Sequence, residues 1–187
     1  MVFLHICCGI CASWSIEKLK ADGHQVTGFF YNPNISPKEE YMRRLAVALQ
    51  VCKAQGISLI EGPYDPVEWA SAVAGLEKEP EGGARCLKCY EMRLLKTAER
   101  AKQLGMEFIT TTLTISPHKD ADVINKIGKS IAPAAFLEYN FKKEDGFKKA
   151  NVFAKDHDLY RQHYCGCQYS MSKGDTGSDR AADTNGR

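Results

Sequence analysis

The 187-residue sequence lacks the features of a membrane, secreted or nucleotide-hydrolysing protein. Its apolar runs are too short to span a bilayer, and no basic segment precedes the apolar start MVFLHICCGICASW. The formal net charge is only +2, which is too weak to identify a nucleic-acid-binding protein. Neither a Walker loop nor the serine-glycine-glycine loop of ATP-splitting enzymes occurs, so we do not expect ATP to be used. We expect a cytoplasmic protein without a membrane partner.

Length and composition favour one globular domain. A chain of 187 residues with 44% hydrophobic and 26% charged residues can bury a core without disulfide bonds. The composition changes once, after Met171, where no large apolar residue follows and the charges balance. We therefore predict one domain over residues 1–170 and a disordered or vector-like tail over residues 171–187.

Short runs rich in β-branched and aromatic residues alternate with stretches of helical periodicity. This alternation indicates an α/β fold, in which a parallel sheet is flanked by helices on both faces. Ligands of such sheets bind at the carboxyl ends of the strands, and the motif HICCGIC follows the first run. The predicted strands lie within residues 2–6, 25–31, 57–62 and 106–113.

Three helices are predicted from their start signals. Residues 36–39 combine Ser36 as the N-cap, a proline at the first helical position and a capping-box glutamate. Residues 65–68 repeat this signal from Asp65, and Ser116 with its following proline gives a weaker version. The apolar stripe expected after the first signal consists of Tyr41, Leu45, Ala48, Leu49 and Cys52.

A fourth helix is predicted from Cys86 to Leu104, because its apolar stripe ends at Gly105. This prediction puts both cysteines of the CLKC motif, Cys86 and Cys89, in the first turn of the helix. The amino-terminal end of a helix favours the thiolate form of cysteine.

Seven of the eight cysteines fall into three tight groups, a pattern typical of metal binding or redox chemistry in a reducing compartment. Their spacings suit either tetrahedral zinc or an iron-sulfur cluster. Four thiolates satisfy one such site, so the surplus in HICCGIC indicates a second metal or a redox dithiol. The seven candidate metal ligands are Cys7, Cys8, Cys11, Cys86, Cys89, Cys165 and Cys167.

Three other residues have structural interpretations that compete with functional ones. Cys52 lies on an apolar stripe, so we expect it to pack as a small hydrophobic residue. His5 lies in a predicted strand, either as a buried, hydrogen-bonded histidine or as a residue that supports a metal ligand. Asp65 is predicted to cap a helix, with a carboxylate near the metals as the alternative.

A basic segment near the C-terminus interleaves Phe141 and Phe147 with lysines. It is suited to hold a phosphate backbone and stacked bases, or it forms a solvated helix face. The candidate substrate-binding residues are Lys142, Lys143, Lys148, Lys149 and Arg161. The hydroxyl-rich loop over residues 110–119 is a second predicted polar or phosphate pocket.

Six motifs occur in one order that resembles the QueH-type epoxyqueuosine reductases over about residues 2–169. The motifs are HICCGIC, YDPVEW, EPEGGARCLKC, TTTLTISPHK, FKK and YRQHYCGC. The resemblance implies a fold like that of the adenine-nucleotide α-hydrolases, so that residues 1–170 would form a catalytic metal-binding domain. It also implies a reaction, the two-electron removal of the epoxide oxygen from epoxyqueuosine in tRNA to give queuosine.

The resemblance further implies a 4Fe-4S cluster beside an additional mononuclear iron. From the spacing we assign the cluster to Cys86, Cys89, Cys165 and Cys167, and the neighbouring iron to Cys7, Cys8 and Cys11. The candidate proton donors, which the sequence does not rank, are His118, Lys119 and Tyr160. The implied partners are a tRNA anticodon stem-loop carrying epoxyqueuosine and an unidentified electron donor.

The sequence departs from the family pattern at two positions. Ile10 stands where the family often has proline, and Asn140 stands where aspartate is usual. The second departure weakens any acid role for position 140.

Two other functions use the same residues. A zinc-stapled RNA-binding module would use the cysteines structurally and the lysines for phosphates, but it would leave HICCGIC without a role. An ATP-dependent tRNA sulfur-transfer enzyme on the same fold would also carry cysteines, but it would require ATP. Iron and sulfide content distinguishes the first alternative, and ATP-independent turnover distinguishes the second.

Overall fold

A computed structural model describes residues 1–170, and the predicted tail over residues 171–187 lies outside the described residues. Its centre is a four-stranded parallel sheet with the order β3-β2-β1-β4. This sheet confirms the predicted α/β class and all four predicted strands. Their bounds are β1 (Val2–His5), β2 (Val26–Phe30), β3 (Leu59–Glu61) and β4 (Phe108–Thr111).

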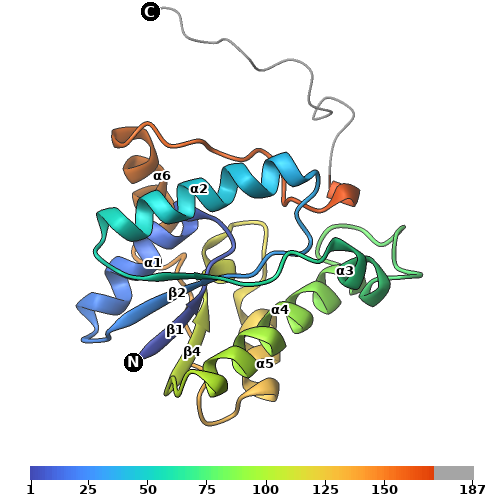
Figure 1. Cartoon of the computed structure of the whole chain (residues 1–187), viewed down its shortest axis with the longest axis horizontal. Helices are drawn as coiled ribbons and strands as arrows, with labels where there is room; N and C mark the ends of the chain where they lie inside the picture. Colours follow the sequence, from blue (N-terminus) through green and yellow to red (C-terminus); the bar gives the residue numbers. More distant parts are fainter. Residues whose placement is uncertain (171–187) are drawn as a thin grey trace, which may run out of the picture.

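Helices cover both faces of the sheet (Figure 1). On one face lie α1 (Gly9–Ala21), α2 (Lys38–Ala54) and α6 (Gly146–Asp156). On the other face lie α4 (Ala84–Gln103) and α5 (Ala121–Ile131). The short elements are α3 (Pro66–Ala72) and the 3₁₀ helices η1 (Thr112–Ile115) and η2 (Gln168–Ser170).

The central strand β1 explains why two cores form. Successive side chains of a strand point to opposite faces of the sheet. Val2 and Leu4 enter the core beneath α1, α2 and α6, whereas Phe3 enters the core beneath α4 and α5. All four residues of β1 are buried, as expected for a parallel strand covered on both faces. No helix of residues 1–170 is long and apolar enough to cross a membrane.

Two of the three predicted helix starts are wrong. The helix α2 begins at Lys38, and Ser36 does not cap it. Instead, the backbone N–H of Ser36 donates to the carbonyl of Gly166 (2.8 Å), so this residue holds a distant segment. The helix α5 begins after Asp120, and the Asp120 carboxylate caps it. Ser116 instead directly follows the 3₁₀ helix η1 and lies outside α5.

The third predicted start is confirmed. The Asp65 carboxylate accepts hydrogen bonds from the backbone N–H groups of Val67 (3.0 Å) and Glu68 (2.9 Å). Asp65 is therefore the N-cap of α3. It is not among the residues that line the thiol-containing pocket described below.

The buried stripe of α2 differs from the prediction at Leu49, which is 51% exposed. At 100° per residue, Leu49 lies about 80° past Tyr41, outside the arc that runs from Val47 to Leu45. Arg44 occupies that arc and is only 3% exposed. The stripe therefore contains a charged residue that periodicity of apolar residues does not find.

The predicted helix of the CLKC motif forms as α4, with one correction. Since α4 begins at Ala84, Cys86 lies in its first turn, but Cys89 lies in its second. The two sulfurs therefore do not share one helix terminus.

Cys52 is 2% exposed, and burial raises the pKa of its thiol to about 12. Both observations confirm its predicted place in the core. We expect Cys52→Ala to lower the free energy of unfolding by about 1 kcal/mol, because it removes one small buried group. Urea denaturation measures this change. Loss of bound metal in this variant, with full metal retained in Cys7→Ala, would contradict the assignment of Cys52 to the core.

Candidate metal centre

Three cysteines gather where β1 ends and α1 begins. The sulfurs of Cys7, Cys8 and Cys11 all lie within 4.8 Å of one another. Cys7 follows the carboxyl end of β1, Cys8 is the N-cap of α1, and Cys11 lies in the first turn of that helix. A strand and a helix separated by only three residues thus bring all three thiols to one point. Within residues 1–170, this is the one group of three or more potential ligands at such spacing.

Hydrogen bonds favour a negative charge on this trio. The Thr112 hydroxyl donates to the Cys7 sulfur (3.1 Å) and accepts from the Cys7 backbone N–H (3.0 Å). The backbone N–H of Cys11 donates to the Cys8 sulfur (3.4 Å). Thr112 belongs to the hydroxyl-rich loop that the sequence singled out. Its role as a partner of Cys7 depends on the pairing of β1 with β4.

Of the three thiols, Cys7 loses its proton first. Hydrogen bonds from Cys11 and Cys8 lower the pKa of Cys7, and the charge of Arg93 and the Thr112 hydroxyl add to this effect against the cost of burial. The pKa of Cys11 is raised by its hydrogen bonds to Cys7 and Cys8 and by burial. The trio therefore holds one thiolate most readily, which is the form that binds metal.

Two cations balance this charge. Arg93 is 2% exposed, and its guanidinium lies 4.0 Å from the Cys89 sulfur and donates to the Asn32 side chain. Burial lowers the pKa of Lys119, but the negative charges of Cys165 and other nearby groups outweigh burial and raise it. The sequence analysis found Lys119 but missed Arg93. The available signal was its position four residues after Cys89 on one helix.

The other four cysteines approach one another from two segments. Cys86 and Cys89 lie on α4, and the backbone N–H of Gly82 donates to the Cys86 sulfur (3.2 Å). Burial raises the pKa of both thiols, and the negative charge of Cys165 raises each further. Cys167 packs with Cys89 in one apolar cluster.

The two groups of cysteines suit different metal centres. Thiolates around one tetrahedral ion lie about 3.8 Å apart, given metal–sulfur bonds of about 2.3 Å. The compact trio approaches this spacing. The sulfurs of Cys86, Cys89, Cys165 and Cys167 are near enough to influence one another, yet they do not form a group within 4.8 Å. A polynuclear cluster accepts such a wider set of thiolates.

Arg44 fixes the C-terminal cysteine segment against α2. Its guanidinium donates to the carbonyl of Cys165 (3.0 Å) and to that of Tyr164 (3.1 Å). Its Nε–H donates to the Glu40 carboxylate (2.6 Å), and both side chains of this ion pair are buried. The sequence analysis missed both residues, because a charged pair four residues apart is usually a solvated helix surface.

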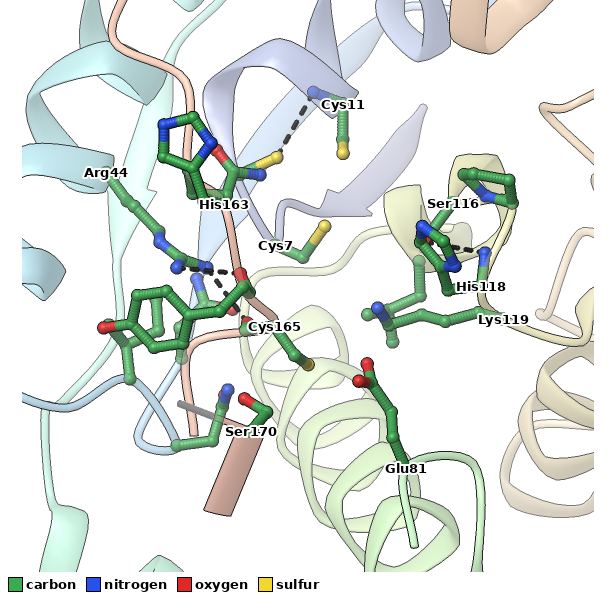
Figure 2. Close-up of a pocket in the computed structure, with 18 of the residues that line it drawn as sticks. Cys7, Cys11, Arg44, Glu81, Ser116, His118, Lys119, His163, Cys165 and Ser170 are labelled. Carbon is green, nitrogen blue, oxygen red and sulfur yellow. Dashed lines mark hydrogen bonds between the residues drawn. The ribbon is translucent and has the colours of Figure 1, made fainter. Parts of the chain in front are cut away.

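One pocket of about 410 Å³ joins these parts. Cys7, Cys165, Lys119 and Glu81 point toward its centre (Figure 2). The hydroxyl-rich loop ends in this pocket, as the sequence analysis expected of a polar pocket. The cavity thus brings thiols, cations and one carboxylate together at the carboxyl edge of the sheet.

The three predicted proton donors have different positions. His118 and Lys119 line the pocket. Tyr160 is not among the lining residues, and its hydroxyl donates to the Glu40 carboxylate (2.7 Å). Burial and this hydrogen bond raise the pKa of Tyr160, so its proton is held.

His5 is fully buried and hydrogen-bonded, which confirms the structural interpretation. Its Nε2–H donates to the carbonyl of Tyr31 (3.1 Å), and its Nδ1 accepts from the Thr111 hydroxyl (2.8 Å). Burial and the charge of Arg93 lower the pKa of His5 to about 3, so the ring is neutral at physiological pH.

The predicted basic segment divides into two parts. Lys142 donates to the carbonyl of Lys119 (2.7 Å), and the Lys149 ammonium lies 3.7 Å from the centre of the Trp14 ring. The side chains of Lys143 and Lys148 are exposed. Arg161 is exposed as well and donates to the Asn151 side chain (2.9 Å).

The two aromatic residues of this segment also differ. Phe141 is 1% exposed and belongs to the core, so it is not available to stack on a base. Phe147 is 40% exposed and lines the pocket. The expectation of two stacking aromatics is therefore wrong for Phe141.

Fold and site together define an α/β protein with a thiol-lined centre at the carboxyl edge of a parallel sheet. The family described as Epoxyqueuosine reductase QueH matches residues 2–173. The proteins of that name from Streptococcus pyogenes and Haemophilus influenzae are each 38% identical to this chain. These matches cover 90% and 91% of this chain and 69% and 71% of the relatives. The chain therefore belongs to the QueH family, whose name denotes oxidoreductases.

A more distant relative agrees. The Epoxyqueuosine reductase QueH of Thermotoga maritima is 33% identical, over 91% of this chain and 90% of its own length. The family resemblance stated from six motifs is thus confirmed.

We expect Arg44→Ala to lower the free energy of unfolding by about 3–5 kcal/mol, because it leaves Glu40 buried without its partner. The matched control is Arg43→Ala. Arg43 is exposed and only lies over the Tyr160 ring, so its loss costs about 1 kcal/mol or less. Chemical denaturation measures both values. Equal stability of the two variants would show that the ion pair does not hold the segment.

Proposed function

We propose that this chain is an epoxyqueuosine reductase, which removes the epoxide oxygen of epoxyqueuosine in tRNA by two-electron reduction and gives queuosine. The observation that carries this proposal is that Cys7, Cys8, Cys11, Cys165 and Lys119 line one pocket. The relatives are named epoxyqueuosine reductases, which supports a reduction of this substrate.

Two metal centres are the proposed cofactors. A 4Fe-4S cluster would be held by Cys86, Cys89, Cys165 and Cys167, and a mononuclear iron by Cys7, Cys8 and Cys11. The lowered pKa of Cys7 and the compact spacing of its trio support the second assignment. When bound, these centres supply electrons and a Lewis acid for the epoxide oxygen.

The protein itself supplies charge and a proton. Lys119 keeps its proton, since nearby negative charges raise its pKa, and its ammonium stabilises negative charge that develops on the epoxide oxygen. His118 lies in the same pocket, and an imidazole is the most frequent proton donor in enzymes. We propose His118 as the proton donor and Lys119 as the electrostatic partner. The Tyr160 hydroxyl is engaged with Glu40 and has neither role.

The tRNA anticodon stem-loop is the proposed substrate, and α6 the proposed contact for its backbone. Phe147 belongs to α6 and lines the pocket, so phosphates bound along this helix would lie near the thiols. Lys143 and Lys148 have exposed ammonium groups for this purpose, and Arg161 adds a third cation. Lys142 and Lys149 add charge while they stabilise the fold.

Metal analysis tests the proposed cofactors. We expect the anaerobically purified protein to be brown and to hold acid-labile sulfide, with more iron than one four-iron cluster contains. The reason is that a four-iron cluster takes four of the seven clustered thiols, which leaves the three of HICCGIC for a further iron. Stoichiometric zinc without sulfide would overturn the proposal and support a zinc-stapled RNA-binding module.

A paired lysine substitution tests the proposed RNA contact. Each phosphate contact contributes a slope of about −0.7 to −0.9 to the dependence of log affinity on log salt. We expect Lys143→Ala with Lys148→Ala to raise KM and to flatten this slope. Single-turnover reduction at saturating RNA should be unchanged, because the lost contact is equal in ground and transition states.

The control for this experiment carries the same loss of charge elsewhere. Lys102 and Lys126 are exposed residues of α4 and α5, on the opposite face of the sheet from α6. Their double alanine variant should bind the stem-loop like the unmodified protein. If both double variants bind alike, then α6 is a solvated surface without a role in RNA binding.

A further inference from the structure

The short helix α3 brings one side chain into the protein interior. Among the residues of α3, only Trp69 is buried, with 3% of its surface exposed. The Asp65 carboxylate caps this helix through two hydrogen bonds, so the position of Trp69 is set by a well-defined start. Both residues belong to the motif YDPVEW, which the proposed reaction leaves without a role.

The indole of Trp69 packs among cysteines. It forms one apolar cluster with Val73, Cys89 and Cys167, and its ring lies 6.1 Å from that of Tyr169. Its Nε1–H is buried and has no hydrogen-bond partner. A buried donor without a partner is costly, so a native protein that retains one needs a reason for it.

The cluster that holds this donor also holds two sulfurs, those of Cys89 and Cys167. Burial raises the pKa of the Cys89 thiol, whereas Arg93 and the Trp69 side chain both lower it. Cys89 shares the buried cluster with the indole, and the Arg93 guanidinium, 4.0 Å from its sulfur, already places one donor at this side chain. A neutral thiol is a weak acceptor, but a thiolate is a strong one.

We propose that the Trp69 N–H donates a hydrogen bond to the Cys89 thiolate when that residue ligates the iron-sulfur cluster, and thereby raises the reduction potential of the cluster. This inference rests on the proposed function, which assigns the cluster to Cys89. An added electron increases the negative charge on the ligand sulfurs, so a donor aimed at one of them stabilises the reduced state more than the oxidised state. Trp69 is in this sense a positioning residue that touches no substrate.

A purely structural role for Trp69 predicts the opposite shift. If the ring only filled space, its removal would admit water to the cluster. Water also stabilises the more negative, reduced state, so the reduction potential would rise. Loss of a hydrogen-bond donor lowers the potential instead. The sign of the shift therefore separates the two roles.

The test is an anaerobic spectroelectrochemical titration of the iron-loaded protein. We expect Trp69→Phe to keep its iron and sulfide and to disfavour reduction about tenfold, which for one electron is a midpoint about 59 mV more negative. A second variant carries β-(3-benzothienyl)alanine at position 69, which keeps the size of tryptophan but replaces its N–H by sulfur. It should show the same negative shift even if Trp69→Phe fails to fold.

The matched control is Trp14→Phe, in the other tryptophan of the chain. Trp14 packs against Gly146 and beneath Lys149, and it lies outside the cluster of Cys89 and Cys167. Its variant should keep the midpoint of the unmodified protein. An unchanged or raised midpoint in the benzothienyl variant would overturn the role of Trp69 and leave the proposed function intact. Zinc without sulfide in the unmodified protein would overturn both.

Discussion

The buried ion pair of Glu40 and Arg44 is the interaction on which the candidate site depends. A guanidinium out of water needs a counter-charge and hydrogen-bond acceptors. Glu40 neutralises it, and the carbonyls of Tyr164 and Cys165 accept from its two terminal nitrogens. The chain after α6 is thereby drawn back across α2 (Figure 1). Among the side chains of residues 1–170, Arg44 is the one with a hydrogen bond to the carbonyl of Cys165.

Charge balance is the second constraint. The seven clustered thiols bring negative charge into a poorly solvated region whenever they ionise. Arg93 from α4 and Lys119 from the loop after η1 both line the pocket and supply positive charge, and helix α1 adds its amino-terminal end. A group of thiolates gathered at one edge of the sheet needs such cations to offset their mutual repulsion. Arg93 also lowers the pKa of Cys7, after the hydrogen bonds from Cys11 and Cys8.

Local sequence signals succeeded where the deciding contacts are local. Alternating runs predicted the four strands, and Asp65 predicted the start of α3, because a cap bonds to residues two and three positions away. The signals failed at Ser36 and Leu49. The Ser36 backbone N–H donates to the carbonyl of Gly166, and the buried arc of α2 contains Arg44 but not Leu49. Ser36 and Arg44 both bond to residues 164–166, a segment that lies far away in the sequence.

The sequence by itself determined the α/β class, the family and the seven cysteines in three groups, because these depend on residue type and short spacing. Only the tertiary structure decided which thiols meet. It gathers Cys7, Cys8 and Cys11 into one compact group and brings Cys165 near α4. It also selects Arg44, Arg93 and Trp69 as their neighbours. The physical reason is that Arg44 and Cys165 are 121 positions apart, so their contact arises from packing and hydrogen bonding that no local pattern records.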